Sequence, residues 1–375
     1  MFDVVIAGAG PAGAVAATVL ARGGARVLVL DRSRFPRAKL CGDTLNPGAL
    51  AVLTRLGLLA VASGALRLDG MIVTGRVVRV EGQYENAHGA ALLRRDLDAR
   101  LLAAAAAAGA RIEERVLVDA PLLDSSAKLP VVAGLIVKGR DGRPLRVPAP
   151  LVIAADGRYS RVARALGLSR SPRHPRRWAL GAYFQDVAGM SSFGEMHVRP
   201  AHYLGVAPLP NGLTNACIVT AGADRQSMKD LLMTTLRTDP QLCGRFAGAR
   251  MVEPPLCLGP LAVDGAAAGM QGLLLAGDAA GFVDPITGDG LRFAFRGGEL
   301  AGLEALRALE HGAGESHVRL LAARTREFAA KWRFNRGVRT VVGFPAAVEA
   351  AEYGAGIAPY VLRRMIRYAA DVHAA

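Results

Sequence analysis

The sequence predicts an α/β protein: a Rossmann-like nucleotide-binding domain with an inserted antiparallel β-sheet domain, followed by C-terminal helices. Three observations predict this class. An apolar strand enters a glycine-rich turn and a helix at the start of the chain, strand-like alternation fills residues 64–93 and 175–258, and the pattern is helical from Glu299 onward. With 375 residues, 51% of them hydrophobic, the chain can bury a large core, and we expect two domains.

The first strand and the helix after it form a dinucleotide-binding fingerprint. An apolar run over residues 2–7 suits a buried parallel strand, and it leads into the turn GAGPAG, residues 8–13, and an alanine-rich helix. Gly8 permits the tight turn, Gly10 lets the backbone approach a pyrophosphate, and Gly13 lets helix and strand pack closely. The helix N-terminus offers free N–H groups and a partial positive charge to phosphates.

The next strand, residues 26–30, ends at Asp31, whose carboxylate would accept hydrogen bonds from an adenosine ribose. NAD and FAD both fit these residues. The sequence has no second fingerprint, so a pyridine nucleotide, if used, must bind in a groove. No pair of cysteines follows the first helix, which argues against the disulfide reductases that bind two dinucleotides.

A second strand–loop–helix joint favours FAD as the resident cofactor. The apolar run Gly272–Ala276 would deliver Asp278 to the carboxyl edge of a sheet, where open α/β folds bind their ligands. A carboxylate there can accept hydrogen bonds from a polyol, which FAD has in its ribityl chain and NAD lacks. The helix that begins near Gly288-Asp289-Gly290 would point its N-terminal dipole at the flavin pyrimidine edge and stabilise the negative charge of reduced flavin.

Four segments of the chain carry further motifs: GAGPAG with Asp31-Arg32, ALLRRDLDARLLAAA (91–105), AADGRYSRVARALGL (154–168) and GDAAGFVDPITGDG (277–290). In this order they resemble the recurring motifs of the para-hydroxybenzoate hydroxylase-like flavoprotein superfamily. That superfamily holds aromatic hydroxylases, flavin-dependent halogenases and geranylgeranyl reductases. The resemblance implies an FAD-dependent oxidoreductase.

The resemblance also implies contacts for particular residues. Arg94 would approach the FAD pyrophosphate, Asp156-Gly157 would be the motif that contacts FAD and pyridine nucleotide, and Asp278 would meet the ribityl chain. Taken singly, Arg94 could instead be a solvated charge and Asp156 a cap for a helix over 158–166. The residues that we assign to cofactor binding are Gly8, Gly10, Ala12, Gly13, Asp31, Arg32, Lys39, Cys41, Arg94, Asp156, Gly157, Gly277, Asp278, Pro285, Gly288, Asp289 and Gly290.

One stretch points to a branch of the superfamily. FPRAKLCGDTLNPGAL (35–50) is similar to the F-x-R-x-K-x-C-G stretch of the geranylgeranyl reductase group, in which the cysteine lies near the isoalloxazine ring; this maps onto Cys41. The Y-x-W-x-F-P motif of that group is present only in part, as YLGVAP (203–208), without its large aromatics. The halogenase motif W-x-W-x-I-P is absent, because the only tryptophans are Trp178 and Trp332.

Two reactions fit these motifs. In the first, NAD(P)H or a separate electron-donor protein reduces FAD, and hydride passes to a C=C bond of a hydrophobic, isoprenoid-like or polyketide-like substrate, with Cys41 and Tyr203 as candidate proton donors. In the second, a monooxygenase uses a flavin C4a-hydroperoxide to hydroxylate or epoxidise an aromatic or polyketide substrate. Cys41 favours the reductase, and the missing aromatics at 205 and 207 favour the oxygenase. A flavin-bearing binding module without turnover is a third interpretation.

The domains are expected to interleave. The FAD-binding domain would comprise residues 1–63, 94–174 and 259–316, the substrate-binding sheet domain 64–93 and 175–258, and a C-terminal helical region 317–375. Asn211-Gly212 predicts a β-hairpin, since this pair suits a two-residue turn. Residues 111–150 predict a three-stranded meander with a turn at Asp141-Gly142.

Charge and cysteine content limit the partners and the compartment. The net charge is +14, and the arginine excess behind it reflects either the base composition of the coding DNA or a surface that attracts an anionic cofactor or acidic lipid headgroups. The arginines are scattered, so we expect no nucleic acid as a partner. The four cysteines show no metal-ligand spacing, and a reducing, cytoplasmic location fits them. The last helix places Arg363, Arg364 and Arg367 beside apolar residues 361, 365 and 366. It would pack on the FAD domain or make peripheral membrane contact.

Overall fold

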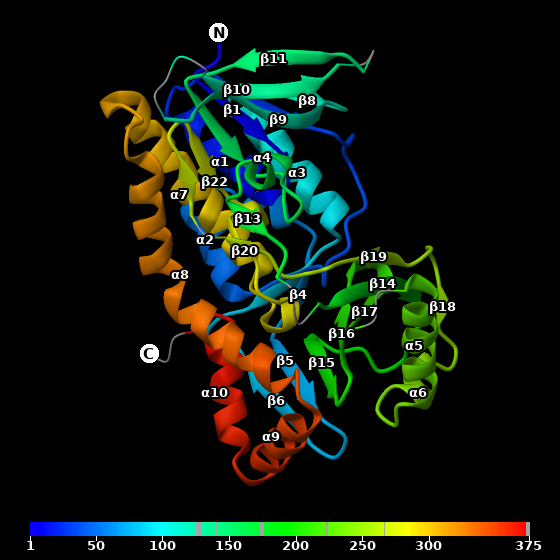
Figure 1. Ribbon diagram of the computed structural model, residues 1–375. Coiled ribbons are helices and arrows are strands. Elements are labelled where there is room, and N and C mark those ends of the chain that lie inside the picture. Colours follow the sequence, from blue (N-terminus) through cyan, green and yellow to red (C-terminus); the bar gives the residue numbers. More distant parts are fainter. Residues whose placement is uncertain are drawn as a thin grey trace.

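A six-stranded sheet forms the centre of the nucleotide-binding domain in the computed structural model, which describes residues 1–124, 126, 129–139, 142–172, 176–221, 224–265 and 267–372 (Figure 1). Neighbouring strands pair in parallel, except that residues 269–270 at one edge pair antiparallel with residues 273–274. Most are buried at every position because both faces of the sheet are covered, which explains their continuous apolar runs. The order is β21 (Gly269–Met270), β22 (Leu273–Leu275), β12 (Leu151–Ala154), β1 (Val4–Ala7), β2 (Val27–Asp31) and β8 (Arg111–Glu114).

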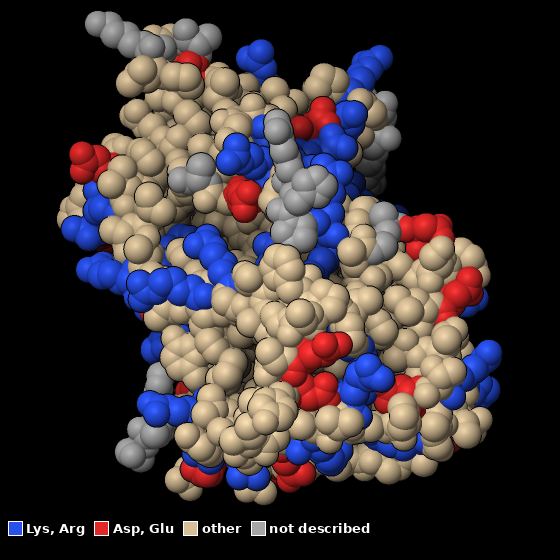
Figure 2. All heavy atoms as spheres, turned by 60° about the horizontal axis from the view of Figure 1, so that its bottom comes forward, with Lys and Arg blue, Asp and Glu red and all other residues tan. Residues whose placement is uncertain are grey.

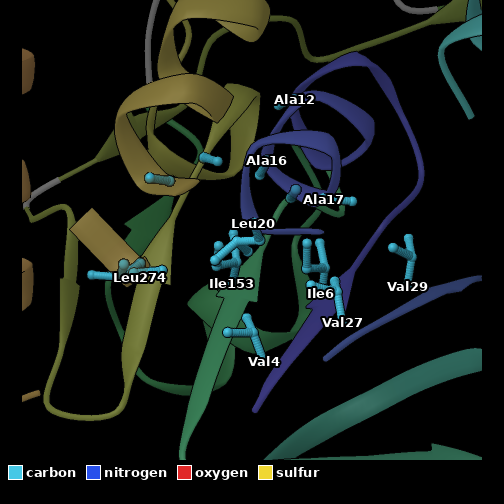
Figure 3. Close-up of a cluster of buried hydrophobic side chains, with 14 of the residues drawn as sticks. Val4, Ile6, Ala12, Ala16, Ala17, Leu20, Val27, Val29, Ile153 and Leu274 are labelled. Atoms are coloured by element: carbon cyan, nitrogen blue, oxygen red, sulfur yellow. The ribbon is translucent and has the colours of Figure 1, made fainter. Parts of the chain in front are cut away.

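Helices cover one face of this sheet. In Figure 3, side chains of the strands such as Ile6 and Ile153 point toward Leu20 and its neighbours on α1 (Pro11–Arg22). Helix α7 (Gly290–His311) packs directly on α1. Gly298 permits this close approach, because a Cβ there would lie only 2.3 Å from the carbonyl oxygen of Ala12. Helices α2 (Pro47–Arg55) and α3 (Arg94–Ala107) extend this layer.

A small antiparallel sheet covers the other face. It consists of β9 (Leu117–Asp124), β10 (Val131–Lys138) and β11 (Pro144–Pro148), and Val132, Leu135 and Val137 pack against β12 and β22 with the help of α4 (Arg161–Ala165). The predicted meander is therefore β9–β11, whereas β8 joins the parallel sheet. Asp141 of the predicted turn lies outside the described residues.

The second domain is built on an eight-stranded sheet. Helices α5 (Arg225–Thr238) and α6 (Cys243–Phe246) cover its back. The sheet is antiparallel as predicted, except that β5 and β15 pair in parallel, because these strands belong to separate insertions. The strands are β18 (Arg250–Met251), β14 (Trp178–Gln185), β17 (Thr214–Thr220), β16 (His202–Pro208), β15 (Phe193–Arg199), β5 (Gly70–Thr74) and β6 (Arg79–Gln83), with β19 (Leu256–Leu258) beside β14.

The predicted hairpin is confirmed. Strands β16 and β17 pair from His202↔Thr220 to Pro208↔Thr214, and the connection includes the short helix η2 (Pro210–Gly212). Asn211 and Gly212 have φ angles of 62° and 70°, the left-handed region that Asn and Gly adopt most readily.

Short elements join the two domains. Strands β3, β7 and β4 form a sheet of their own, so only β5 and β6 of the segment 64–93 enter the large sheet. The remaining elements are β3 (Thr44–Leu45), η1 (Leu59–Ala62), β4 (Leu66–Leu68), β7 (Gly89–Ala91), β13 (Ser169–Arg170), β20 (Asp264–Gly265), η3 (Gly277–Ala280) and η4 (Pro285–Thr287).

Three helices end the chain and bridge the domains: α8 (Ser316–Val341), α9 (Pro345–Ile357) and α10 (Pro359–Ala369) (Figure 1). The expectation that the last helix packs on the FAD domain is wrong for most of its length. Ile366 packs against Tyr84 and Met71, on the side of β5 and β6, because the amphipathic α10 finds its apolar neighbours there. No helix in the described part of the chain has the length and apolar content that crossing a bilayer requires.

Candidate functional site

A cavity of about 1000 Å³ lies where the two domains and the C-terminal helices meet. It is lined by the turn of the fingerprint, the stretch 37–42, the loop 155–158 and the loop 277–290. The face of strands β15–β17 that is turned away from α5 and α6, called the front of the large sheet below, completes the lining. The structure thus gathers nearly all the predicted residues in one place: Gly8, Gly10, Ala12, Asp31, Arg32, Lys39, Cys41, Arg94, Asp156, Gly157, Tyr203, Gly277, Asp278, Pro285, Gly288 and Gly290.

The glycine-rich turn has the form that the fingerprint predicts. Gly8 has φ +96°, and a Cβ there would lie 2.5 Å from the carbonyl oxygen of Ala155. A Cβ at Gly13 would lie 1.9 Å from the carbonyl oxygen of Gly8, so this glycine serves packing and does not line the cavity. Gly10 is the N-cap of α1 and provides no side-chain cap, so the first N–H groups of α1 are available to an anionic ligand.

Asp31 lies at the end of β2 and braces this turn. Its Oδ2 accepts a hydrogen bond of 2.8 Å from the Ala9 N–H, and its Oδ1 accepts one of 2.7 Å from the Ser33 N–H. Each carboxylate oxygen has two lone pairs, so these bonds leave capacity for a ribose hydroxyl. The predicted contact with adenosine remains a prediction.

Basic side chains line the cavity, and a buried carboxylate orders two of them. Asp98 accepts two hydrogen bonds of 2.8 Å from Arg94 and lies 3.2 Å from Arg37. Arg94 is buried, so the reading of it as a solvated charge is wrong. Burial alone would lower the pKa of Arg94, but the Asp98 carboxylate outweighs it and raises that pKa. Burial, with the charge of Arg158 next in importance, lowers the pKa of Lys39 to about 8.

Arg158 is a site residue that the motifs alone did not identify. Its Nη2 lies 3.3 Å from Asp278 Oδ2, and its guanidinium lies 5.1 Å from the centre of the Phe282 ring. Its Nε and Nη1 are buried without a hydrogen-bond partner among the described residues, as is Asp156 Oδ1. Buried polar groups in native proteins are almost always paired, so these atoms point to a polar ligand in the cavity. The signal was present in the sequence as the third residue of DGR (156–158).

Asp156 also serves the backbone beside the cavity. Its Oδ2 accepts a hydrogen bond of 2.9 Å from the Arg161 N–H at the start of α4. The N-cap of this helix is Ser160, whose side chain accepts from the Ala163 N–H. Asp156 therefore supports the helix start without being its N-cap.

The comparisons with known proteins decide the family. A family model described as FAD binding domain matches residues 1–243, about two thirds of the chain. The chain belongs to this FAD-binding family. The flavoprotein is 32% identical over 328 residues to a menaquinone reductase of Mycobacterium tuberculosis, covering 80% of this chain and 75% of that protein. It is 32% identical over 334 residues to digeranylgeranylglycerophospholipid reductase 1 of Methanopyrus kandleri, covering 82% and 81%.

Solved structures share the fold of the flavoprotein. A geranylgeranyl bacteriochlorophyll reductase-like protein of Thermoplasma acidophilum superimposes with a TM-score of 0.81 at 23% identity, covering 93% of this chain and 90% of that chain. A flavin-dependent brominase variant gives 0.82 at 20% identity, covering 98% and 94%. The family and the relatives together make this chain an FAD-dependent oxidoreductase, as the resemblance implied.

The residues present fit FAD. The uncapped first turn of α1 and the arginines beside it suit a diphosphate. Arg158, with two unpaired donors, and Asp278, with its acceptors, lie together where a polyol chain would need both. Gly288 has φ +70° and a Cβ there would have no neighbour within 4 Å, so the backbone offers open space for a flat ring before α7.

Asp289 does not line the cavity of the flavoprotein. Its Oδ1 accepts a hydrogen bond of 3.0 Å from Asn46 Nδ2, the N-cap side chain of α2, and lies 3.5 Å from Lys331 Nζ of α8. Burial raises its pKa to about 6. The carboxylate thus joins the start of α7 to α2 and α8, whereas its neighbours Gly288 and Gly290 line the cavity.

The two candidate proton donors, the Tyr203 hydroxyl and the Cys41 thiol, lie in different surroundings. The Tyr203 hydroxyl donates a hydrogen bond of 2.5 Å to Asp284, whose other oxygen lies 3.2 Å from Arg177 Nη1. Burial, followed by the charge of Asp284, raises the pKa of Tyr203 well above its usual value. Its proton is therefore poorly suited to transfer, while Cys41 lines the cavity beside Arg94.

Asp43 is a second residue that the motifs did not assign. It is fully buried with φ 54° and accepts hydrogen bonds from the Arg94 N–H (2.8 Å), the Tyr183 hydroxyl (2.8 Å) and Asn215 Nδ2 (2.5 Å). Asn215 also donates to the Cys41 carbonyl at 2.8 Å. This network fixes the Cys41 segment between α3 and the large sheet. Burial raises the pKa of Asp43 to about 6.

Proposed function

We propose that this flavoprotein reduces a carbon–carbon double bond in a long apolar, isoprenoid-like substrate, with NAD(P)H or a separate electron-donor protein as the source of electrons. One observation carries the proposal. The cavity that holds the cofactor motifs continues, without a separating wall, into a region lined almost wholly by apolar side chains. Its walls come from the front of the large sheet and from the C-terminal helices: Val73, Met196, Val198, Val219, Val338, Val342, Val348, Ala355, Ala358, Leu362 and Met365.

The character of these walls selects the substrate class. Valine, alanine and methionine side chains offer dispersion contacts but no hydrogen bonds, so they favour a hydrocarbon chain over a sugar or a peptide. The relatives are named as reductases of menaquinone and of digeranylgeranylglycerophospholipid, which supports a lipid-like substrate for this chain too.

The chain's own residues would prepare the reaction. Bound FAD would supply hydride to one carbon of the double bond. Arg158 and Asp278 would hold the polar arm of the cofactor, and the N-terminus of α7 would stabilise negative charge at its ring. The apolar walls exclude water from the double bond. We assign the proton for the second carbon to the Cys41 thiol, because the Tyr203 hydroxyl is bonded to Asp284.

Product mass tests this proposal directly. The purified flavoprotein is incubated with NADPH and a prenylated naphthoquinone or an unsaturated archaeal-type lipid, and the product is measured by mass spectrometry. We expect a gain of two hydrogens for each double bond reduced. A gain of one oxygen would instead establish a monooxygenase, and flavin that NADPH fails to bleach would point to a protein electron donor.

One observation favours the monooxygenase as the second candidate. Tyr203, Gly205 and Ala207 alternate along β16 and all line the cavity, so the positions of the large aromatics in the reductase motif are held here by Gly and Ala. A Cβ at Gly205 would have no neighbour closer than 3.9 Å. This open space could receive a ring system, which suits an aromatic substrate.

A further inference from the structure

We propose that one exposed apolar face of the molecule docks on a lipid membrane with anionic headgroups and takes substrate from it. The docking face consists of Val77, Phe344, Tyr353, Ile357, Tyr360 and Val361. The inference deepens the proposed function, because it gives the route by which an apolar substrate reaches the cavity.

The docking face exposes large apolar side chains to an unusual degree. Val77 is 88% exposed, Tyr353 75%, Tyr360 69%, Ile357 68% and Phe344 62%. Exposed apolar residues are common singly, but a group of this size marks an interaction site. Helix α9 makes the point most clearly, because Val348 is its one buried residue although most of its side chains are apolar.

The docking face surrounds one end of the cavity. Val78, the neighbour of Val77, lines the cavity, as do Ala355 and Ala358, which lie beside Ile357. Glu352 ties the two sides of this rim together, because its Oε1 accepts a hydrogen bond of 2.5 Å from the Val77 N–H. A substrate that enters here therefore passes directly from the docking face to the apolar walls.

The chemistry of the docking face favours lipid over a second copy of the chain. Three exposed cations, Arg76, Arg363 and Arg364, flank the apolar side chains. Figure 2 brings this end of the molecule forward and shows broad uncharged surface with charged side chains around it. A second copy would bring the same arginines together, and both copies carry a net charge of +14. Anionic headgroups instead complement the arginines, and the two tyrosines suit the boundary between headgroup and acyl chain.

Vesicle sedimentation tests the proposal without reference to catalysis. The flavin-loaded protein is mixed with vesicles of phosphatidylcholine and phosphatidylglycerol, or with vesicles of phosphatidylcholine alone. We expect binding to the mixed vesicles that weakens as salt is raised. The triple variant Tyr353→Ser, Ile357→Ser, Tyr360→Ser should lose this binding, and Arg363→Gln and Arg364→Gln should each weaken it about fivefold.

A matched control removes as many exposed apolar side chains elsewhere. Leu123, Leu129 and Leu145 lie on and beside the β9–β11 sheet, at the opposite end of the molecule (Figure 1). The variant with all three changed to Ser should bind vesicles like the unchanged protein. The docking face is refuted if the mixed vesicles are not bound, if both triple variants bind equally, or if the face instead mediates a dimer seen by sedimentation.

A second readout separates this inference from the reaction itself. Turnover of a short, water-soluble substrate should be unchanged in the docking-face variant, whereas turnover of substrate embedded in vesicles should fall with vesicle binding. If vesicles are bound and neither substrate reacts, the docking face stands and the proposed reaction fails. If embedded substrate reacts equally in both proteins, the docking face fails as the entry route.

Discussion

Arg158 shows how a single buried side chain restricts what the cavity can hold. Its guanidinium is fixed from two sides, by Asp278 and by the Phe282 ring, yet two of its nitrogens lack a partner among the described residues. Such an arrangement is costly unless a ligand supplies acceptors, since an unpaired buried donor costs about 1–3 kcal/mol. The chain therefore keeps Arg158 in a state that a bound cofactor would relieve.

The first prediction concerns this residue. Arg158→Gln should weaken FAD binding by about ten- to a hundredfold, because charge-assisted hydrogen bonds of about 1.5–3 kcal/mol are lost. The measurement is a fluorescence titration of the apoprotein with FAD. Arg111→Gln, an exposed arginine paired with Glu113, is the matched control and should bind FAD normally. Equal affinity in both variants would contradict the role of Arg158.

The two candidate proton donors should respond differently to substitution. Tyr203→Phe removes a hydrogen bond to the buried Asp284, so the free energy of unfolding should fall by about 1–3 kcal/mol while the folded protein keeps its turnover. Cys41→Ala should leave stability nearly unchanged and lower turnover by about a hundredfold or more, as loss of a general acid does. Denaturant titration and steady-state kinetics separate the two effects. The reverse pattern would make Tyr203 the donor.

At the scale of elements, the start of α7 is held by a buried ionisable group. Asp289 joins α7 to α2 through Asn46 and to α8 through Lys331. Burial raises its pKa from 3.8 to about 6, so the native protein binds this proton more tightly than the unfolded chain does. The carboxyl group therefore favours the native state at low pH, and its contribution declines as pH rises from about 4 through about 6 and levels off near pH 7.

Asp289→Asn should remove this dependence. Relative to the variant, the unchanged protein should lose about 2 kcal/mol of unfolding free energy between pH 4 and pH 6, out of about 3 kcal/mol over the whole titration at 1.36 kcal/mol for each pKa unit. Urea titrations of both proteins across this range give the difference. Asp230→Asn on the exposed side of α5 controls for the added amide. A difference that does not change with pH would show that Asp289 is not the group responsible.

The elements also show what sequence reasoning can reach. The turn 8–13, the hairpin at Asn211-Gly212 and the joint at 272–290 were predicted, because each depends on residues close together in the chain. The orientation of Asp289 was not predicted, since it depends on how α7 is rotated against α2 and α8. The placement of α10 on β6 was missed for a similar reason: the contact of Ile366 with Tyr84 joins segments far apart in sequence, and apolar periodicity does not identify the partner.

At the scale of the whole molecule, the C-terminal helices are anchored to the FAD domain by a buried ionic cluster. Lys331 lies 3.0 Å from Asp371 and 3.5 Å from Asp289, and its Nζ also donates to the carbonyl of Ala369 at 2.8 Å. Because α9 and α10 form one wall of the cavity, this cluster holds the wall against the rest of the protein.

Lys331→Met should therefore destabilise the protein strongly. Breaking a buried ion pair by removing one partner costs about 3–5 kcal/mol, because the remaining charges are left uncompensated. Chemical denaturation measures the loss, and Arg26→Met, which breaks the more exposed pair with Asp3, should cost far less because solvent screens that pair. Similar values for the two variants would show that the cluster does not anchor the helices.

The interleaved order of the central sheet has a consequence for biosynthesis. Strand β1 lies between β2 and β12, β22 flanks β12, and the last loop of the cavity lining named above, residues 277–290, follows β22. A ribosome makes the fingerprint first and this loop some 270 residues later. The emerging polypeptide thus carries only part of the candidate cofactor pocket until this loop has been made. Cofactor capture therefore requires the polypeptide to be made at least as far as residue 290.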